Sequence, residues 1–181
     1  MQDVKEQFIE LWKESGKERI FKACGTSMQP LIRDSDNLGV IPVRHADELH
    51  IGDIALFQWP SGMVAHRIVG KFSKDNCMYL YEKGDNTALL PTMISGEKIV
   101  GKVVRIYRPG ITIDLTRSFW LIANRSAGYY WHYLIAIYQF LYARKIKLLG
   151  VKKYPRISSA FNKIYLFLST LPNLMFRRNN R

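Results

Sequence analysis

Short apolar runs separated by turn residues fill the middle of the chain. They cover residues 38–43, 54–59, 63–69, 78–81 and 99–107, and Gly, Pro, Asp or Asn bound most of them. Runs of this length between turn-forming residues are typical of β-strands, and a series of them favours an all-β domain. The sequence therefore predicts a mainly β domain over residues 23–110.

The first residues follow a different pattern. Apolar side chains recur at helical spacing and a candidate helix stop follows at Gly16; they are Val4, Phe8, Leu11 and Trp12. This spacing predicts a short amphipathic helix within residues 1–22. The apolar run of about 7–15 residues that marks a secretory signal peptide does not occur here. We therefore expect neither a signal peptide nor a clear transmembrane anchor at this end.

The C-terminal segment, residues 111–181, is rich in aromatic residues. Residues 129–143 contain only His132 and Gln139 as strongly polar positions, and a second apolar stretch covers residues 161–176. A helix that spans a membrane needs about twenty mostly apolar residues, and neither stretch reaches that length without interruption. The pattern predicts a helical segment that does not span a membrane. We therefore expect the protein to be peripheral to a membrane or cytoplasmic.

Charge divides the chain into two unequal parts. The net charge is +12, and residues 105–181 hold 14 Lys and Arg against the single acid Asp114. Aromatic and basic residues together suit the headgroup layer of an anionic membrane. Two interpretations of residues 118–181 stay open: a helical module lying on such a membrane, or a helix pair packed on the β domain. Nucleic acid is not favoured as a partner, because no helix-turn-helix or single-strand-binding motif is visible.

Three polar residues are candidates for catalysis. Ser27 lies in a turn-like segment, His66 on a predicted strand, and Asp85 in Gly-Asp-Asn. A serine hydroxyl needs a neighbouring base to become a nucleophile, and that base needs a group to orient it. Each residue alone has an ordinary structural explanation: a turn serine, a core histidine and a hairpin turn. Arg67 alternates with His66 along the strand, so we expect it to serve the structure.

The order of four short motifs is more specific than any one residue. These are Ser27-Met28-Gln29-Pro30, Gly52-Asp53-Ile54, His66-Arg67 and Gly84-Asp85-Asn86. Over residues 23–107 the chain resembles the signal peptidase I family, in the branch of the endoplasmic reticulum and archaea that uses histidine as base. The related LexA-type self-cleaving repressors share this layout but carry lysine at the position of His66.

The resemblance implies a function and a site. Ser27 would be the nucleophile and His66 the base, with Met28 and Pro30 beside the substrate. The substrate would be an extended peptide with small residues before the cut.

Two departures from the family pattern affect the expected site. Gly25 replaces a serine that can help to bind the oxyanion, so the oxyanion hole would depend on backbone N–H groups at Ser27 and Gly25. Residues 87–91 read Thr-Ala-Leu-Leu-Pro in place of the usual acidic pair and arginine. Asp85 is then the nearby acid expected to orient His66.

The resulting hypothesis is a serine endopeptidase that cleaves a signal or leader peptide by a Ser-His-Asp mechanism. We expect no cofactor and no metal, because the four histidines do not pair with cysteines at ligand spacing. The alternative is a catalytically silent peptidase-like module, docked on a membrane or a nucleic acid for binding or regulation. The missing acids after Gly84-Asp85-Asn86 and the glycine at position 25 motivate this alternative.

Overall fold

One antiparallel sheet of eight strands organises the protein. The computed structural model describes residues 2–87 and 90–149, together with residues 163, 165, 167, 168, 171 and 176. The elements in chain order are α1 (Gln2–Ser15), β1 (Arg19–Lys22), β2 (Asn37–Pro42), η1 (Ala46–Glu48), β3 (Ile54–Trp59), β4 (Gly62–Lys74), β5 (Cys77–Lys83), β6 (Thr92–Ser95), η2 (Gly96–Lys98), β7 (Ile99–Arg108), β8 (Ile111–Asp114) and α2 (Ser118–Leu149).

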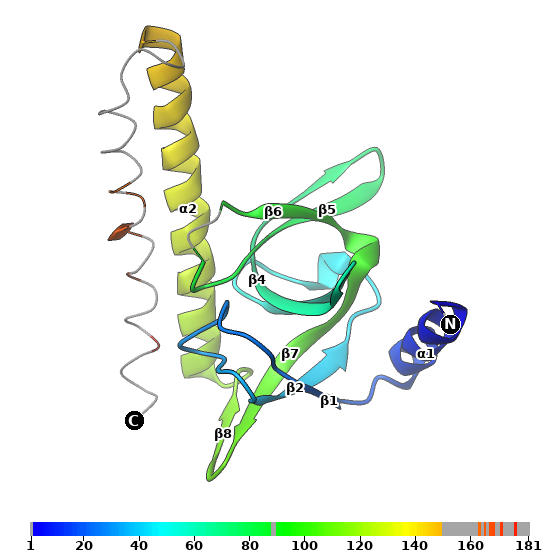
Figure 1. Ribbon diagram of the computed structural model, residues 1–181. Helices are drawn as coiled ribbons and strands as arrows, with labels where there is room; N and C mark the ends of the chain where they lie inside the picture. The colour runs from blue at the N-terminus through cyan, green and yellow to red at the C-terminus, as the bar shows by residue number, and fades with distance from the viewer. Residues whose placement is uncertain are drawn as a thin grey trace.

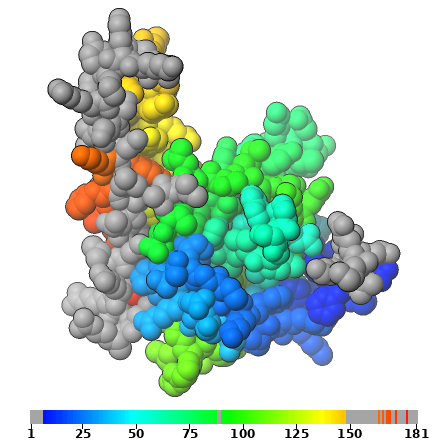
Figure 2. Space-filling model, viewed as in Figure 1, coloured from blue at the N-terminus to red at the C-terminus, as the bar shows by residue number. Residues whose placement is uncertain are grey.

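The strands are hydrogen-bonded in the order β1-β2-β7-β3-β4-β5-β6, and β8 pairs with β7. The sheet curls on itself, and α1 and α2 lie on opposite sides of it (Figure 1, Figure 2). The pairing register shifts at three places, the last of them between Ile68 and Gly70 in β4. Such irregularities bend strands and increase their twist, which accounts for the curl. The prediction of a mainly β fold with helices before and after it is confirmed.

The sheet extends further than the sequence predicted at both ends. Residues 19–22, expected in the first helix, form strand β1, because α1 ends at Ser15 and Gly16 adopts a φ of 62°. Residues 111–114, expected in the tail, form strand β8, since Gly110 with a φ of 75° lets β7 fold back on itself. Positive φ angles of this kind favour glycine.

Strand β3 is buried on both faces and separates two apolar cores. Ile54 and Leu56 belong to the core that also contains Trp12 of α1, whereas Ala55 and Phe57 belong to the second core. Side chains along a strand alternate between the two faces of a sheet. Burial of both faces over residues 54–57 explains why these four residues of β3 are all apolar.

Helix α2 packs on the β domain and approaches the turn before β3 unusually closely. A Cβ on Gly128 would lie 2.4 Å from the Cα of Gly52, which itself has a φ of 98°. Trp131 is fully buried on the same side of the helix, and His132 Nδ1 lies 2.9 Å from the carbonyl oxygen of Val69. Of the two interpretations of the tail, packing on the β domain therefore holds for the inner face of α2.

The predicted second apolar stretch, residues 161–176, lies largely outside the described residues. Of those that are described, Tyr165 and Phe176 are buried, and their rings contact Tyr138 and Trp120 of α2. Among the described residues, no helix is long and apolar enough to cross a membrane.

Candidate active site

Three side chains from separate segments form a continuous hydrogen-bonded chain. His66 Nε2 lies 2.9 Å from Ser27 Oγ, and His66 Nδ1 lies 2.5 Å from Glu82 Oε2. Ser27 comes from the loop between β1 and β2, His66 from β4 and Glu82 from the adjacent strand β5. When Nδ1–H donates to the carboxylate, the lone pair of Nε2 is free to accept the serine proton. This is the geometry of a nucleophile, a base and an orienting acid.

The carboxylate that contacts His66 is that of Glu82 and not that of Asp85, so the expectation that Asp85 lies beside His66 was wrong. The Asp85 carboxylate instead accepts hydrogen bonds from Arg67 Nε at 2.8 Å and Arg67 Nη2 at 2.6 Å, and both side chains are fully buried. Strand alternation explains the difference. Glu82 shares a face of β5 with the core residue Leu80, and this face meets His66, whereas Asp85 follows the end of the strand. Glu82 directly follows the predicted strand 78–81 and continues its alternation two residues after Leu80, and this was the signal that could have found it.

Arg67 connects the site to α2. Its Nη1 donates to the carbonyl oxygen of Gly52 at 2.8 Å and to Oδ1 of Asn124 at 2.7 Å. The ring of Phe176 lies 5.2 Å from the guanidinium carbon. The guanidinium is thus hydrogen-bonded on several sides, as a buried cation requires. The Arg67 side chain thus joins Asp85, the loop at Gly52 and helix α2.

The segment that carries Ser27 is anchored on one side by the apolar core. Met28, predicted to contact substrate, is only 4% exposed and belongs to an apolar core. Its side chain therefore secures the segment and does not face a bound peptide. Pro30 is half-buried after a cis peptide bond, and its contact with substrate stays a prediction.

The turn after β5 holds the same segment through backbone contacts. Asn86 N–H donates to the carbonyl oxygen of Ser27 at 2.7 Å, and its side-chain amide donates to that of Thr26 at 3.1 Å. Gly84 lies so close that a Cβ would be 2.9 Å from the Ser27 carbonyl oxygen and 3.2 Å from His66 Nε2. Only glycine fits this approach of the turn to the nucleophile. The Gly-Asp-Asn sequence therefore positions Ser27, while its aspartate supports Arg67.

Of the two backbone N–H groups expected to bind the oxyanion, one is already hydrogen-bonded and the other is not. Gly25 N–H donates to Asp34 Oδ1 at 2.8 Å, so this group is already occupied and the prediction for Gly25 is not supported. The N–H of Ser27 has no acceptor among the described residues. Ser27 N–H thus remains the candidate donor for an oxyanion.

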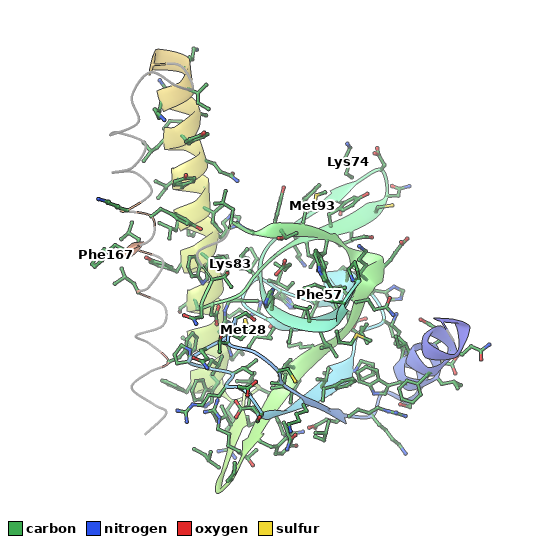
Figure 3. All side chains as sticks on the ribbon, viewed as in Figure 1. Met28, Phe57, Lys74, Lys83, Met93 and Phe167 are labelled. Atoms are coloured by element: carbon green, nitrogen blue, oxygen red, sulfur yellow. The ribbon has the colours of Figure 1, made fainter. Side chains whose placement is uncertain are left out.

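Lys83 is a buried cation between β5 and α2 (Figure 3). Its Nζ donates to the carbonyl oxygen of Thr87 at 2.6 Å and lies 4.2 Å from the ring of Trp131. Arg67 is its partner in the register of β4 and β5. Desolvation lowers the pKa of Lys83 from 10.5 to about 8, against the opposing effect of the carboxylates of Asp85 and Glu82.

This lowered pKa predicts a pH dependence of stability. Between pH 8 and pH 10.5 the unfolded chain binds more protons at Lys83 than the folded protein does. The free energy of unfolding should therefore rise across this interval, by at most about 3 kcal/mol. Lys83→Met should lack that rise in urea denaturation series, whereas Lys74→Met at the exposed tip of β4 should keep it. Parallel curves for the parent and Lys83→Met would contradict the assignment.

Within the described residues, no cluster of three or more His, Cys, Asp or Glu side chains could hold a metal ion. No protein-family model matches the chain, and the comparison with curated proteins finds no significant match. The chemical interpretation therefore depends on the arrangement of Ser27, His66 and Glu82.

Proposed function

We propose that this protein is a serine endopeptidase, similar to the signal peptidase I family, that cleaves a signal or leader peptide. The single observation that carries the proposal is the hydrogen-bonded chain from Ser27 through His66 to Glu82. The motif order described above supports the same conclusion and adds the class of substrate. Neither a cofactor nor a metal ion is needed for this chemistry.

The reaction follows from the positions of the three side chains. Ser27 Oγ attacks the peptide carbonyl while His66 Nε2 takes the hydroxyl proton, and the Glu82 carboxylate stabilises the imidazolium that forms. His66 then donates the proton to the leaving amine, and an acyl group stays on Ser27 Oγ. A water molecule, deprotonated by His66, attacks the ester; the bond to Ser27 Oγ breaks, His66 returns the proton to Oγ, and the new carboxyl end is released. The Ser27 N–H would bind the oxyanion, and one such donor is worth roughly two to three orders of magnitude in rate.

The partial exposure of the site supports a macromolecular substrate. The His66 side chain is 18% exposed and Ser27 is half-buried, so the nucleophile is not sealed inside the core. An extended peptide bound beside a sheet would satisfy its backbone groups by hydrogen bonds, with side-chain pockets setting specificity. Small residues before the cut are inferred from the family resemblance alone.

One observation favours the alternative of a catalytically silent binding module. Because Asp34 occupies the Gly25 N–H, Ser27 N–H is the one member of the expected donor pair that is still available among the described residues. A site with one hydrogen-bond donor to the oxyanion would cleave slowly, or would cleave only after substrate binding brings a second donor into place. The two possibilities differ in whether any product depends on Ser27.

The deciding experiment compares protein N-termini by mass spectrometry between cells that carry the native chain and cells that carry Ser27→Ala. We expect a set of N-termini, preceded by small residues, that disappears with Ser27→Ala. Ser61→Ala, a substitution of an exposed serine in the β3–β4 turn, should leave that set unchanged. Identical N-terminal sets in all three cases, with the proteins folded and expressed, would reject cleavage and favour the binding module.

A further inference from the structure

Helix α2 exposes a row of large apolar side chains on the side turned away from the sheet. Each member is between 46% and 65% exposed; we call this row the outer stripe, and it consists of Phe119, Ile122, Tyr129, Tyr133, Ile137 and Phe140. At about 100° per residue these six positions fall within roughly 80° of one another around the helix axis. Trp131 and Ile135, buried against the sheet, point the opposite way.

The described part of the C-terminal segment covers a different side of α2. Phe176 stacks on Trp120, Tyr165 contacts Tyr138, and the hydroxyl of Tyr130 donates to the carbonyl oxygen of Leu168 at 2.7 Å. None of these three α2 residues belongs to the outer stripe. A contiguous apolar patch exposed to water usually marks an interaction site, because contact of large apolar side chains with water is unfavourable.

The charges around the outer stripe identify the chemistry of its partner. Residues 118–149 contain no acid, exposed Arg117 precedes the stripe, and Arg144 and Lys147 follow it. The guanidinium of Arg144 lies 5.3 Å from the ring centre of Phe140. An aromatic and aliphatic row flanked by cations suits a bilayer surface, where aromatic rings settle at the headgroup level and long basic side chains reach anionic headgroups.

Two other partners fit less well. A second copy of the chain, packed stripe to stripe, would bring cations together without an acid in either α2 to pair with them. A nucleic acid lying along α2 would need Lys or Arg side chains distributed along the helix to contact its phosphates. Between residues 118 and 143 the one Lys or Arg is Arg125, which already donates to the carbonyl oxygen of Ile51 and lies 3.7 Å from the Asp53 carboxylate.

We propose that α2 lies in the headgroup layer of an anionic membrane, with the outer stripe inserted and the sheet facing the water. This placement uses the excess charge of residues 105–181, which hold 14 basic residues and one acid. Each basic residue near an anionic surface contributes to attraction that falls with salt. The proposal is independent of cleavage, because it concerns the face of α2 opposite the sheet.

The test is co-sedimentation of the full chain with vesicles. Binding to vesicles of phosphatidylserine and phosphatidylcholine should exceed binding to pure phosphatidylcholine by about tenfold or more, and should weaken with salt. The combined substitution Ile122→Gln, Ile137→Gln and Phe140→Gln should lower binding by at least about tenfold. These side chains are exposed, so the folded state should persist in circular dichroism. The matched control replaces three exposed apolar residues of the sheet: Ile20→Gln, Met93→Gln and Ile111→Gln.

Three results would overturn the proposal. The first is equal vesicle binding by the parent and the stripe variant. The second is no binding of the parent to anionic vesicles, including the case in which it binds DNA or RNA instead. The third is a dimer in sedimentation velocity that the stripe substitutions dissociate. Ser27→Ala should bind vesicles like the parent, so failure of this proposal and failure of the peptidase proposal can be told apart.

Discussion

Glu82→Gln is expected to lower the rate of peptide cleavage by about three to four orders of magnitude while the protein stays folded. Glutamine has the size of glutamate, but its amide can donate to His66 Nδ1, which the carboxylate cannot do. The ring then favours the tautomer with its proton on Nε2, and Nε2 can no longer accept the proton of Ser27. The imidazolium that forms during attack also loses the negative charge 2.5 Å from Nδ1.

The measurement is single-turnover cleavage of a substrate found by N-terminal mass spectrometry. Glu97→Gln, at an exposed position in η2, is the matched control and should cleave like the parent. Asp85→Asn, measured at a temperature where it is folded, should keep far more activity than Glu82→Gln. If Glu82→Gln cleaves normally and folded Asp85→Asn does not, the assignment of Glu82 as the orienting acid is incorrect.

Arg67→Met is expected to destabilise the protein by about 3–5 kcal/mol, enough to unfold a large fraction of a marginally stable domain. The substitution leaves the Asp85 carboxylate buried without the cation that donates two hydrogen bonds to it. It also removes the donor that joins the carbonyl oxygen of Gly52 to Asn124 of α2. A buried polar group that loses its partner costs more than the pair contributes, because desolvation is no longer compensated.

Urea denaturation of four proteins separates these contributions. The double variant Arg67→Met and Asp85→Leu should recover much of the lost stability, because no unpaired charge is left behind. Arg105→Met, at a pair with Glu18 whose side chains are 39% and 21% exposed, should lower the stability far less than Arg67→Met, because solvent screens exposed ion pairs. A double variant as unstable as Arg67→Met alone would show that the buried pair is not the cause.

Most strands, and the choice of Ser27 and His66 as candidate site residues, could be predicted from the sequence. The apolar runs between turn residues predicted strands that the structure contains at β2, β3, β4, β5 and β7, since strand patterns depend on local alternation. The motif order brought Ser27 and His66 together as candidates, and the structure places their side chains 2.9 Å apart. The partner of His66 was missed, because a turn acid in a familiar motif was preferred to a strand acid outside it.

Several properties follow from the sequence alone: the apolar periodicity of strands and helices, the concentration of basic charge after residue 104, and the candidate nucleophile and base. These properties depend on residue types and on short spacings. The folded chain is needed to show that Glu82 contacts His66, that Met28 is buried and that Gly128 of α2 lies against Gly52. For Glu82 the reason is that neighbours across strands depend on register, and the register between β4 and β5 shifts between Ile68 and Gly70. No local pattern specifies such a shift, because it arises from how the whole curled sheet packs.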